Sequence, residues 1–222
     1  MQCWRRLSVS ILGCSLLALG ACSVVRPGPA PVIPRPAEFI PLGLGASYLS
    51  GEVIGGLKAR NAKMRAAKVK PLGPAAAAQY LASTENELRS QTAGIGLDVL
   101  RVGDTILIRI PAALTFDSGS ATVKPQFDAT LKEIARTIRT RNQSFVDVFA
   151  HTDTTGSPQV NLALSQKRAM AVATYLAGHG VAKARIASKG YGETMPLYNP
   201  DETEAQKAAN RRVEIRLVAY RG

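Results

Sequence analysis

HTDTTG at residues 151–156 and NLALSQKRA at residues 161–169 give the strongest structural signal in this chain. The apolar run 145–150 before them is typical of a buried strand, and apolar residues recur at helical spacing within and beyond the second segment. Asp153 therefore follows a strand and Arg168 lies on the next helix, so opposite charges are fixed on neighbouring elements. We expect such a pair to suit a ligand that carries both an ammonium and a carboxylate group.

Strand and helix patterns continue on both sides of these segments. Residues 98–102 and 105–111 are short apolar strands, and the Gly103–Asp104 pair between them predicts a hairpin. Further patterns predict helices at 125–139, 161–177 and 202–209 and strands at 185–189 and 212–219. Residues 97–222 are thus predicted to be an α/β domain, a mixed β-sheet covered by helices in the order β-α-β-α-β, then a short helix and a final strand.

The first 42 residues are typical of an export signal followed by a tether. Arg5 and Arg6 precede an apolar run that is too short to span a membrane comfortably and that ends in LGAC at residues 19–22. This ending resembles a bacterial lipobox, which implies a lipoprotein signal peptide at 1–21 and a lipidated Cys22. Six prolines between residues 27 and 41 predict an extended spacer within a tether at 22–42.

Residues 43–96 form a segment that is rich in small and basic residues. Small residues recur every fourth position from Gly43 to Gly55, which fits either a close-packing helix or a flexible loop. Residues 58–70 contain six basic and no acidic residues, so they form either a contact with anionic lipid head groups or a solvated helix face. An alanine-rich helix is expected at 75–91.

Composition argues against several classes of function. The net charge of +12 points to anionic surroundings. Aromatic content is only 5%, however, and the sequence has neither a recognition helix nor zinc-ligand spacing. We therefore expect no nucleic-acid partner. The three cysteines all lie within residues 3–22, and there are two histidines, so we expect no disulfide, metal site or cofactor. No Gly-x-Ser-x-Gly motif is present, and we expect no enzymatic activity.

The second half of the chain resembles the OmpA-like C-terminal domain, a family that binds peptidoglycan. The matching motifs occur in family order: LTFD at 114–117, SA at 120–121, HTD at 151–153, Asn161, LS at 164–165, RA at 168–169, GYGE at 190–193 and NRRVEI at 210–215. The resemblance implies a non-covalent contact with diaminopimelate in the peptidoglycan stem peptides.

In that family, the residues matching Asp153 and Arg168 are the main side-chain contacts. The resemblance therefore implies that Asp153 accepts a hydrogen bond from the ligand ammonium and that Arg168 donates two to its carboxylate, a geometry that lysine cannot match. The alternative is a structural salt bridge between these two residues. Leu164 is expected to pack beneath the guanidinium of Arg168, four residues further along the helix.

Other residues at or near the site have two possible roles. Asn161 caps the helix or contacts the ligand. Phe116 and Asp117 match positions that line the site, although Asp117 could instead shape its own loop. Thr152 is a neighbouring contact. Arg212, or the adjacent Arg211, reaches the ligand or pairs with local acids, and His151 is expected to be a bystander.

These features together predict a periplasm-facing lipoprotein of the outer membrane, tethered to the cell wall through its last domain. By resemblance to the sorting of bacterial lipoproteins, Ser23 after the cysteine favours the outer over the inner membrane. The alternative is an envelope scaffold in which residues 43–95 bind a partner protein.

Overall fold

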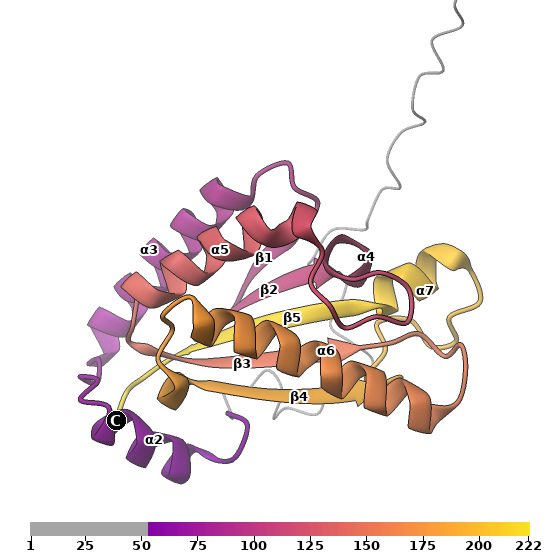
Figure 1. Ribbon diagram of the computed structural model, residues 1–222. Coiled ribbons are helices and arrows are strands. Elements are labelled where there is room, and N and C mark those ends of the chain that lie inside the picture. Colours follow the sequence, from indigo (N-terminus) through magenta and orange to yellow (C-terminus); the bar gives the residue numbers. More distant parts are fainter. Residues whose placement is uncertain (1–52) are drawn as a thin grey trace, which may run out of the picture. The chain divides into compact units, whose positions relative to one another are not determined.

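The computed structural model describes residues 53–222 (Figure 1). The predicted signal peptide, Cys22, the proline-rich tether and most of the small-residue repeat lie outside the described residues. The elements are α2 (Leu57–Ala66), α3 (Pro74–Thr92), β1 (Asp98–Val102), β2 (Thr105–Pro111), α4 (Ala112–Thr115), α5 (Pro125–Thr140), β3 (Ser144–His151), α6 (Pro158–Gly178), the 3-10 helix η2 (Lys183–Arg185), β4 (Ile186–Gly192), α7 (Glu204–Asn210) and β5 (Arg212–Ala219).

The strands form one mixed sheet in the order β1-β2-β5-β3-β4, which confirms the predicted fold class. β1 and β2 form the expected hairpin, in which Val102 pairs with Thr105 across Gly103–Asp104. The last strand, β5, lies between β2 and β3 and is antiparallel to both, whereas β3 and β4 are parallel. This order places the ends of β3 and β4 and the start of β5 at one end of the sheet.

One face of the sheet is covered by α3, α5 and α6 (Figure 1). Val146, Val148 and Ala150 of β3 point into this core because alternate residues of a strand face the same side. The predicted apolar stripe of α5, from Phe127 to Ile138, is buried against them. Each fully buried Leu or Ile contributes roughly 1.5–3 kcal/mol, so this layer supplies much of the stability.

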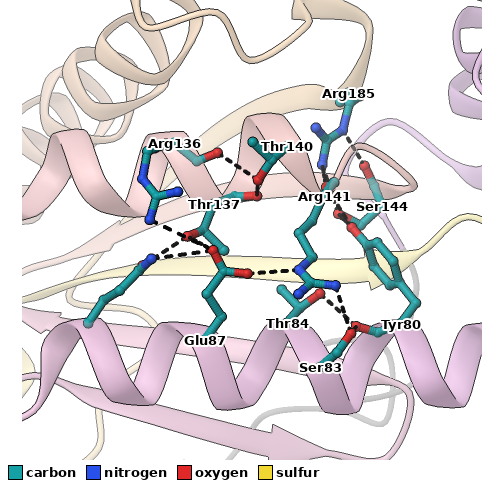
Figure 2. Close-up of polar contacts among 11 residues, drawn as sticks. Tyr80, Ser83, Thr84, Glu87, Arg136, Thr137, Thr140, Arg141, Ser144 and Arg185 are labelled. Atoms are coloured by element: carbon teal, nitrogen blue, oxygen red, sulfur yellow. Dashed lines mark hydrogen bonds and ion pairs between the residues drawn. The ribbon is translucent and has the colours of Figure 1, made fainter.

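Polar contacts fix α3 to the start of β3 and the end of α5, as Figure 2 shows. The Tyr80 hydroxyl donates to the Arg141 carbonyl oxygen (2.7 Å), and Nε of Arg141 donates to Glu87 (2.9 Å). The buried guanidinium of Arg185 donates to the carbonyl oxygens of Ile138 (2.6 Å), Ser144 (2.8 Å) and Arg141 (3.0 Å). Arg185 thus satisfies carbonyl groups at the end of α5, and burial lowers its pKa to about 10. It lies in η2, one residue before the strand that we expected it to start.

The opposite face of the sheet, called here the second face, receives α2. Met64 and Val53 pack against Phe145 and Tyr220, while Arg60 is buried and forms a 2.9 Å ion pair with Asp147 of β3. We expected residues 43–96 to precede the domain, but 53–96 pack against the sheet and α5 within one compact unit. The structure therefore extends the domain to include α2 and α3.

No helix within residues 53–222 has the length and hydropathy that crossing a membrane would require.

Candidate functional site

The loop between β3 and α6 brings the predicted residues to one end of the sheet. Ser157 caps α6, since its hydroxyl accepts from the amide of Val160, and Pro158 occupies the first helical turn. The prediction that Asn161 is the cap is therefore wrong: Asn161 lies one turn inside the helix. Sequence reasoning missed the Ser157–Pro158 pair, which is itself a helix-start signal.

Asn161 instead ties the loop to its surroundings. Its buried side-chain amide donates to the carbonyl oxygens of Asp153 (3.3 Å) and Thr155 (3.2 Å) and to the carboxylate of Glu193 (2.7 Å). Gly156 has a φ of +98°, a conformation that favours glycine, and allows the loop to turn there. We infer that Asn161 positions the loop on which Asp153 lies.

Asp201 fixes the same loop from the other side. Its carboxylate accepts hydrogen bonds from the amide and hydroxyl of Thr154 and from the side chain of Asn210. Burial alone would raise the pKa of Asp201, but these hydrogen bonds outweigh it and lower the pKa below its usual value. Sequence reasoning did not identify this residue, because nothing local to it indicates a contact with the 152–156 loop.

The carboxylate of Asp153 has two partners. Oδ1 accepts from the amide of Thr155 (3.1 Å), and Oδ2 lies 2.5 Å from Nη1 of Arg211. Arg211 also pairs with Glu204 of α7, whose side chain is 77% exposed. Of the two arginines considered from the sequence, Arg211 is thus the one at Asp153.

The guanidinium of Arg168 lies over the ring of Phe116, with Cζ 5.2 Å from the ring centroid. Its Nε donates to the Ser120 carbonyl oxygen (2.8 Å) and Nη2 to that of Asp117 (3.3 Å), whereas Nη1 makes no hydrogen bond to any described residue. Burial lowers the pKa of Arg168, as does the charge of Arg211, and Asp153 opposes this shift. The three charged groups therefore lie near enough to influence one another.

Asp153 and Arg168 form no ion pair with each other among the described residues. Each is held by other groups, so the geometry does not match the alternative of a structural salt bridge. The result is a carboxylate and a guanidinium fixed separately in one site.

The remaining predicted residues surround this pair. Phe116 is buried beneath Arg168, and Leu164 is half-buried on α6. The side chain of Asp117 is 79% exposed and pairs with Lys124 (3.1 Å), so only its carbonyl group contacts Arg168. Thr152 is buried, and its amide donates to the Gly192 carbonyl oxygen (2.9 Å).

The prediction that Arg212 reaches a ligand does not fit the structure. Arg212 is 1% exposed on the second face, and it donates to Glu214 (3.0 Å) and to the carbonyl oxygens of Asn210 and Met195. Arg211 is the C-cap residue of α7 and pairs with Asp153, whereas Arg212 is the first residue of β5 and lies on the second face. Arg109 and His151 lie near the same carboxylate of Glu214, at 3.0 and 3.4 Å.

His151 is buried in this cluster and stacks on Tyr191. Burial, together with the charges of Arg212 and Arg109, lowers the pKa of His151 well below its usual value. The ring is therefore neutral at pH 7. Its place on the second face, away from the Asp153 carboxylate, agrees with the expectation that it is a bystander.

α6 is held unusually close to β4, and this contact positions Arg168. The amide of Gly190 donates to the Gln166 side chain (2.9 Å) and that of Gly192 to the Ser165 hydroxyl (2.8 Å). A Cβ atom on Gly190 would lie 2.2 Å from the backbone nitrogen of Gln166, so only glycine fits there.

Comparison with known proteins gives a family match over this part of the chain. The model of the OmpA family matches residues 115–211, a range that contains Asp153, Arg168 and Arg211. Residues 115–211 match the OmpA family. The predicted resemblance is therefore confirmed.

Two relatives and one solved structure are informative. The chain is 41% identical over 138 residues to probable lipoprotein YiaD of Escherichia coli (strain K12), an alignment that covers 62% of this chain and 63% of YiaD. It is 35% identical over 102 residues to peptidoglycan-binding protein ArfA of Mycobacterium bovis, covering 46% of this chain and 31% of ArfA. The cell wall anchor of the T6SS from Pseudomonas aeruginosa matches with a TM-score of 0.51 and 28% identity, over 64% of this chain and 96% of that structure. The chain thus spans less than two thirds of either relative.

Proposed function

We propose that this OmpA-family domain binds peptidoglycan non-covalently through the diaminopimelate of its stem peptides. One observation carries the proposal: Asp153 and Arg168 lie in one site but are bonded to other groups and not to each other. The names of ArfA and of the T6SS cell wall anchor support a wall ligand for this class of domain. In this proposal the protein binds and does not catalyse.

The free end of diaminopimelate has an ammonium and a carboxylate on one carbon, which matches the two charges of the site. Nη1 of Arg168 has no hydrogen bond to a described residue, so its edge is available to the ligand carboxylate. The ammonium would bind Asp153 in competition with Arg211, and Glu204 remains as a partner for Arg211 when Asp153 is released. The site thereby exchanges one ion pair for another, which limits the cost of desolvation.

We further propose that the chain is an outer-membrane lipoprotein, lipidated at Cys22 and tethering that membrane to the wall from its periplasmic side. The LGAC sequence at residues 19–22 supports the anchor, and the similarity to probable lipoprotein YiaD supports the class. The outer-membrane proteins among the relatives, such as porin F of Pseudomonas fluorescens, support an envelope location.

A pull-down with purified sacculi tests the binding proposal. We expect the wild-type protein to sediment with sacculi, and Asp153→Ala and Arg168→Ala each to reduce the bound fraction by at least about tenfold, the loss of one charge-assisted pair. Lys167→Ala is the matched control, because Lys167 is exposed on the same helix next to Arg168. Equal sedimentation of all four proteins would contradict the assignment of Asp153 and Arg168 to the binding site.

A further inference from the structure

α2 and the turn after it present an unpaired group of basic side chains, called here the cationic surface. Within the described residues, the side chains of this group are exposed and none forms an ion pair. No acidic residue occurs between Val53 and Thr84 to neutralise them. The members of the cationic surface are Lys58, Lys63, Arg65, Lys68 and Lys70.

Several exposed arginines elsewhere in the domain do have acidic partners. Arg89 pairs with Glu85 (2.9 Å), Arg136 with Glu133 (2.8 Å) and Arg221 with Asp104 (2.8 Å). Since residues 53–222 provide no such partner around α2, about five charges remain that an external anion could neutralise.

The cationic surface is held rigidly by buried contacts of the same helix. Arg60 pairs with Asp147 beneath α2 and also donates to the Ile54 carbonyl oxygen (3.1 Å), while Met64 is fully buried against the sheet. Because Arg60, Asn61 and Met64 face inward, the 100° rotation per residue turns Ala59, Ala62 and Ala66 outward. The basic side chains flank these small residues, so a broad partner could approach the helix closely.

The cationic surface and the candidate site lie at opposite ends of β3. Phe145 and Asp147, near the start of the strand, contact α2, whereas Asp153 follows its end. An eight-residue strand spans about 26 Å, which separates the two surfaces. Figure 1 shows α2 near the C-terminus and α7, which carries Glu204, at the other end of the sheet.

We propose that the cationic surface binds the anionic phospholipid head groups of a bilayer. Long basic side chains reach phosphate groups while their stems lie along the helix. The aromatic rings of Phe145 and Tyr220 next to α2 are buried, so neither is offered for stacking on a nucleic-acid base.

This binding mode fixes the orientation of the domain. α2 faces the bilayer, and the loop that carries Asp153 faces away from it. That consequence rests on the proposed function of the site, whereas lipid binding by α2 does not.

Vesicle flotation of the full chain tests the proposal. Cys22→Ser is introduced throughout, so that an acyl group contributes nothing. The vesicles contain phosphatidylcholine alone or phosphatidylcholine with about 30% phosphatidylglycerol. Each basic residue near an anionic surface contributes about 1 kcal/mol, which is about a fivefold change in the binding constant. We expect at least about tenfold stronger binding to the anionic vesicles, lost in Lys63→Glu/Arg65→Glu and reduced in Lys63→Gln/Arg65→Gln.

Lys132→Glu/Arg139→Glu on α5 is the matched control, since it makes the same charge change at exposed positions of another helix. It should retain most of the binding, and all variants should keep the wild-type melting temperature and sacculus binding. Equal binding to both kinds of vesicle, or equal loss in the control, would overturn the proposal. Binding to double-stranded DNA without binding to anionic vesicles would also overturn it.

Discussion

Arg211 is placed between two carboxylates, and this arrangement governs how Asp153 meets a cation. Asp153 holds one side of the guanidinium and the exposed Glu204 the other. A ligand ammonium can therefore take Asp153 without leaving Arg211 unpaired. In the proposed binding mode Glu204 acts through Arg211 and needs no contact with the ligand.

Glu204→Gln removes the second partner of Arg211 and should weaken ligand binding. Exposed ion pairs are worth up to about 1 kcal/mol, so we expect at most about a fivefold increase in Kd for a diaminopimelate-containing muropeptide, measured by calorimetry. Glu202→Gln, an exposed neighbour, should have no effect. Unchanged or tighter binding by Glu204→Gln would argue against the exchange of partners.

The lowered pKa of His151 affects how the free energy of unfolding depends on pH. Its pKa is lowered by burial in the folded state, so below about pH 6.5 the unfolded chain binds a proton that the folded chain does not. His151 should then contribute a fall in the free energy of unfolding as pH decreases from 6.5 to 5, by up to about 1.4 kcal/mol per pH unit, and Glu214 beside it opposes this contribution because burial raises its pKa to about 8.

His151→Gln should reduce this slope in urea unfolding measured at several pH values, whereas His179→Gln should not. Arg109, Arg212 and Glu214 face the ring from β2 and β5 and remain in both variants. The same slope in His151→Gln as in the wild type would show that another group titrates.

The sequence singled out Asp153 and Arg168, which the structure places in one site, but could not choose between Arg211 and Arg212. Those arginines are adjacent where α7 ends and β5 begins, and only the position of this boundary places Arg212 on the second face and leaves Arg211 at the site. Asn161 was misassigned because its residue type suits a cap equally well, and Ser157 precedes the better starting residue, Pro158.

At the scale of elements, local turn chemistry gave accurate bounds for the first hairpin. The β1–β2 hairpin has the predicted bounds because Gly103 occurs in the tight turn with a φ of +53°. Arg185 had no such signal: a basic residue before an apolar run gives no indication that its side chain is buried under the end of α5.

Arg185→Met should destabilise the domain strongly. The substitution leaves the buried carbonyl groups of Ile138 and Ser144 without their donor, at a cost of roughly 1–3 kcal/mol each. We expect the free energy of unfolding in urea to fall by about 3 kcal/mol or more. Lys183→Met, an exposed change in the same 3-10 helix, should cost under about 0.5 kcal/mol, and equal effects would contradict the assigned role.

At the scale of the whole molecule, the packing of α2 and α3 changes how the scaffold alternative can be tested. Deleting residues 43–95 would remove Arg60 and Tyr80 together with their contacts to Asp147 and Ser144. A loss of function in that deletion variant could therefore result from unfolding as well as from the loss of a binding partner. Substitutions on the exposed side of α2 are the sharper test.

The sequence could not predict this docking because its contacts join residues far apart in the chain. Arg60 is one of six basic residues between 58 and 70, and only the position of Asp147, 87 residues away, makes it different. The family motifs likewise begin near residue 114, so they gave no reason to place the start of the domain earlier.

The central claim is that Arg168 recognises the ligand carboxylate while Asp153 recognises the ammonium beside it. Calorimetric titration of wild type and Arg168→Gln with a muropeptide whose diaminopimelate ε-carboxylate is free or amidated tests this most directly. We predict that amidation weakens binding to the wild type by at least about tenfold and changes binding to Arg168→Gln little, because the partner of the carboxylate is already gone. An equal loss on amidation in both proteins, or no loss in the wild type, would contradict it.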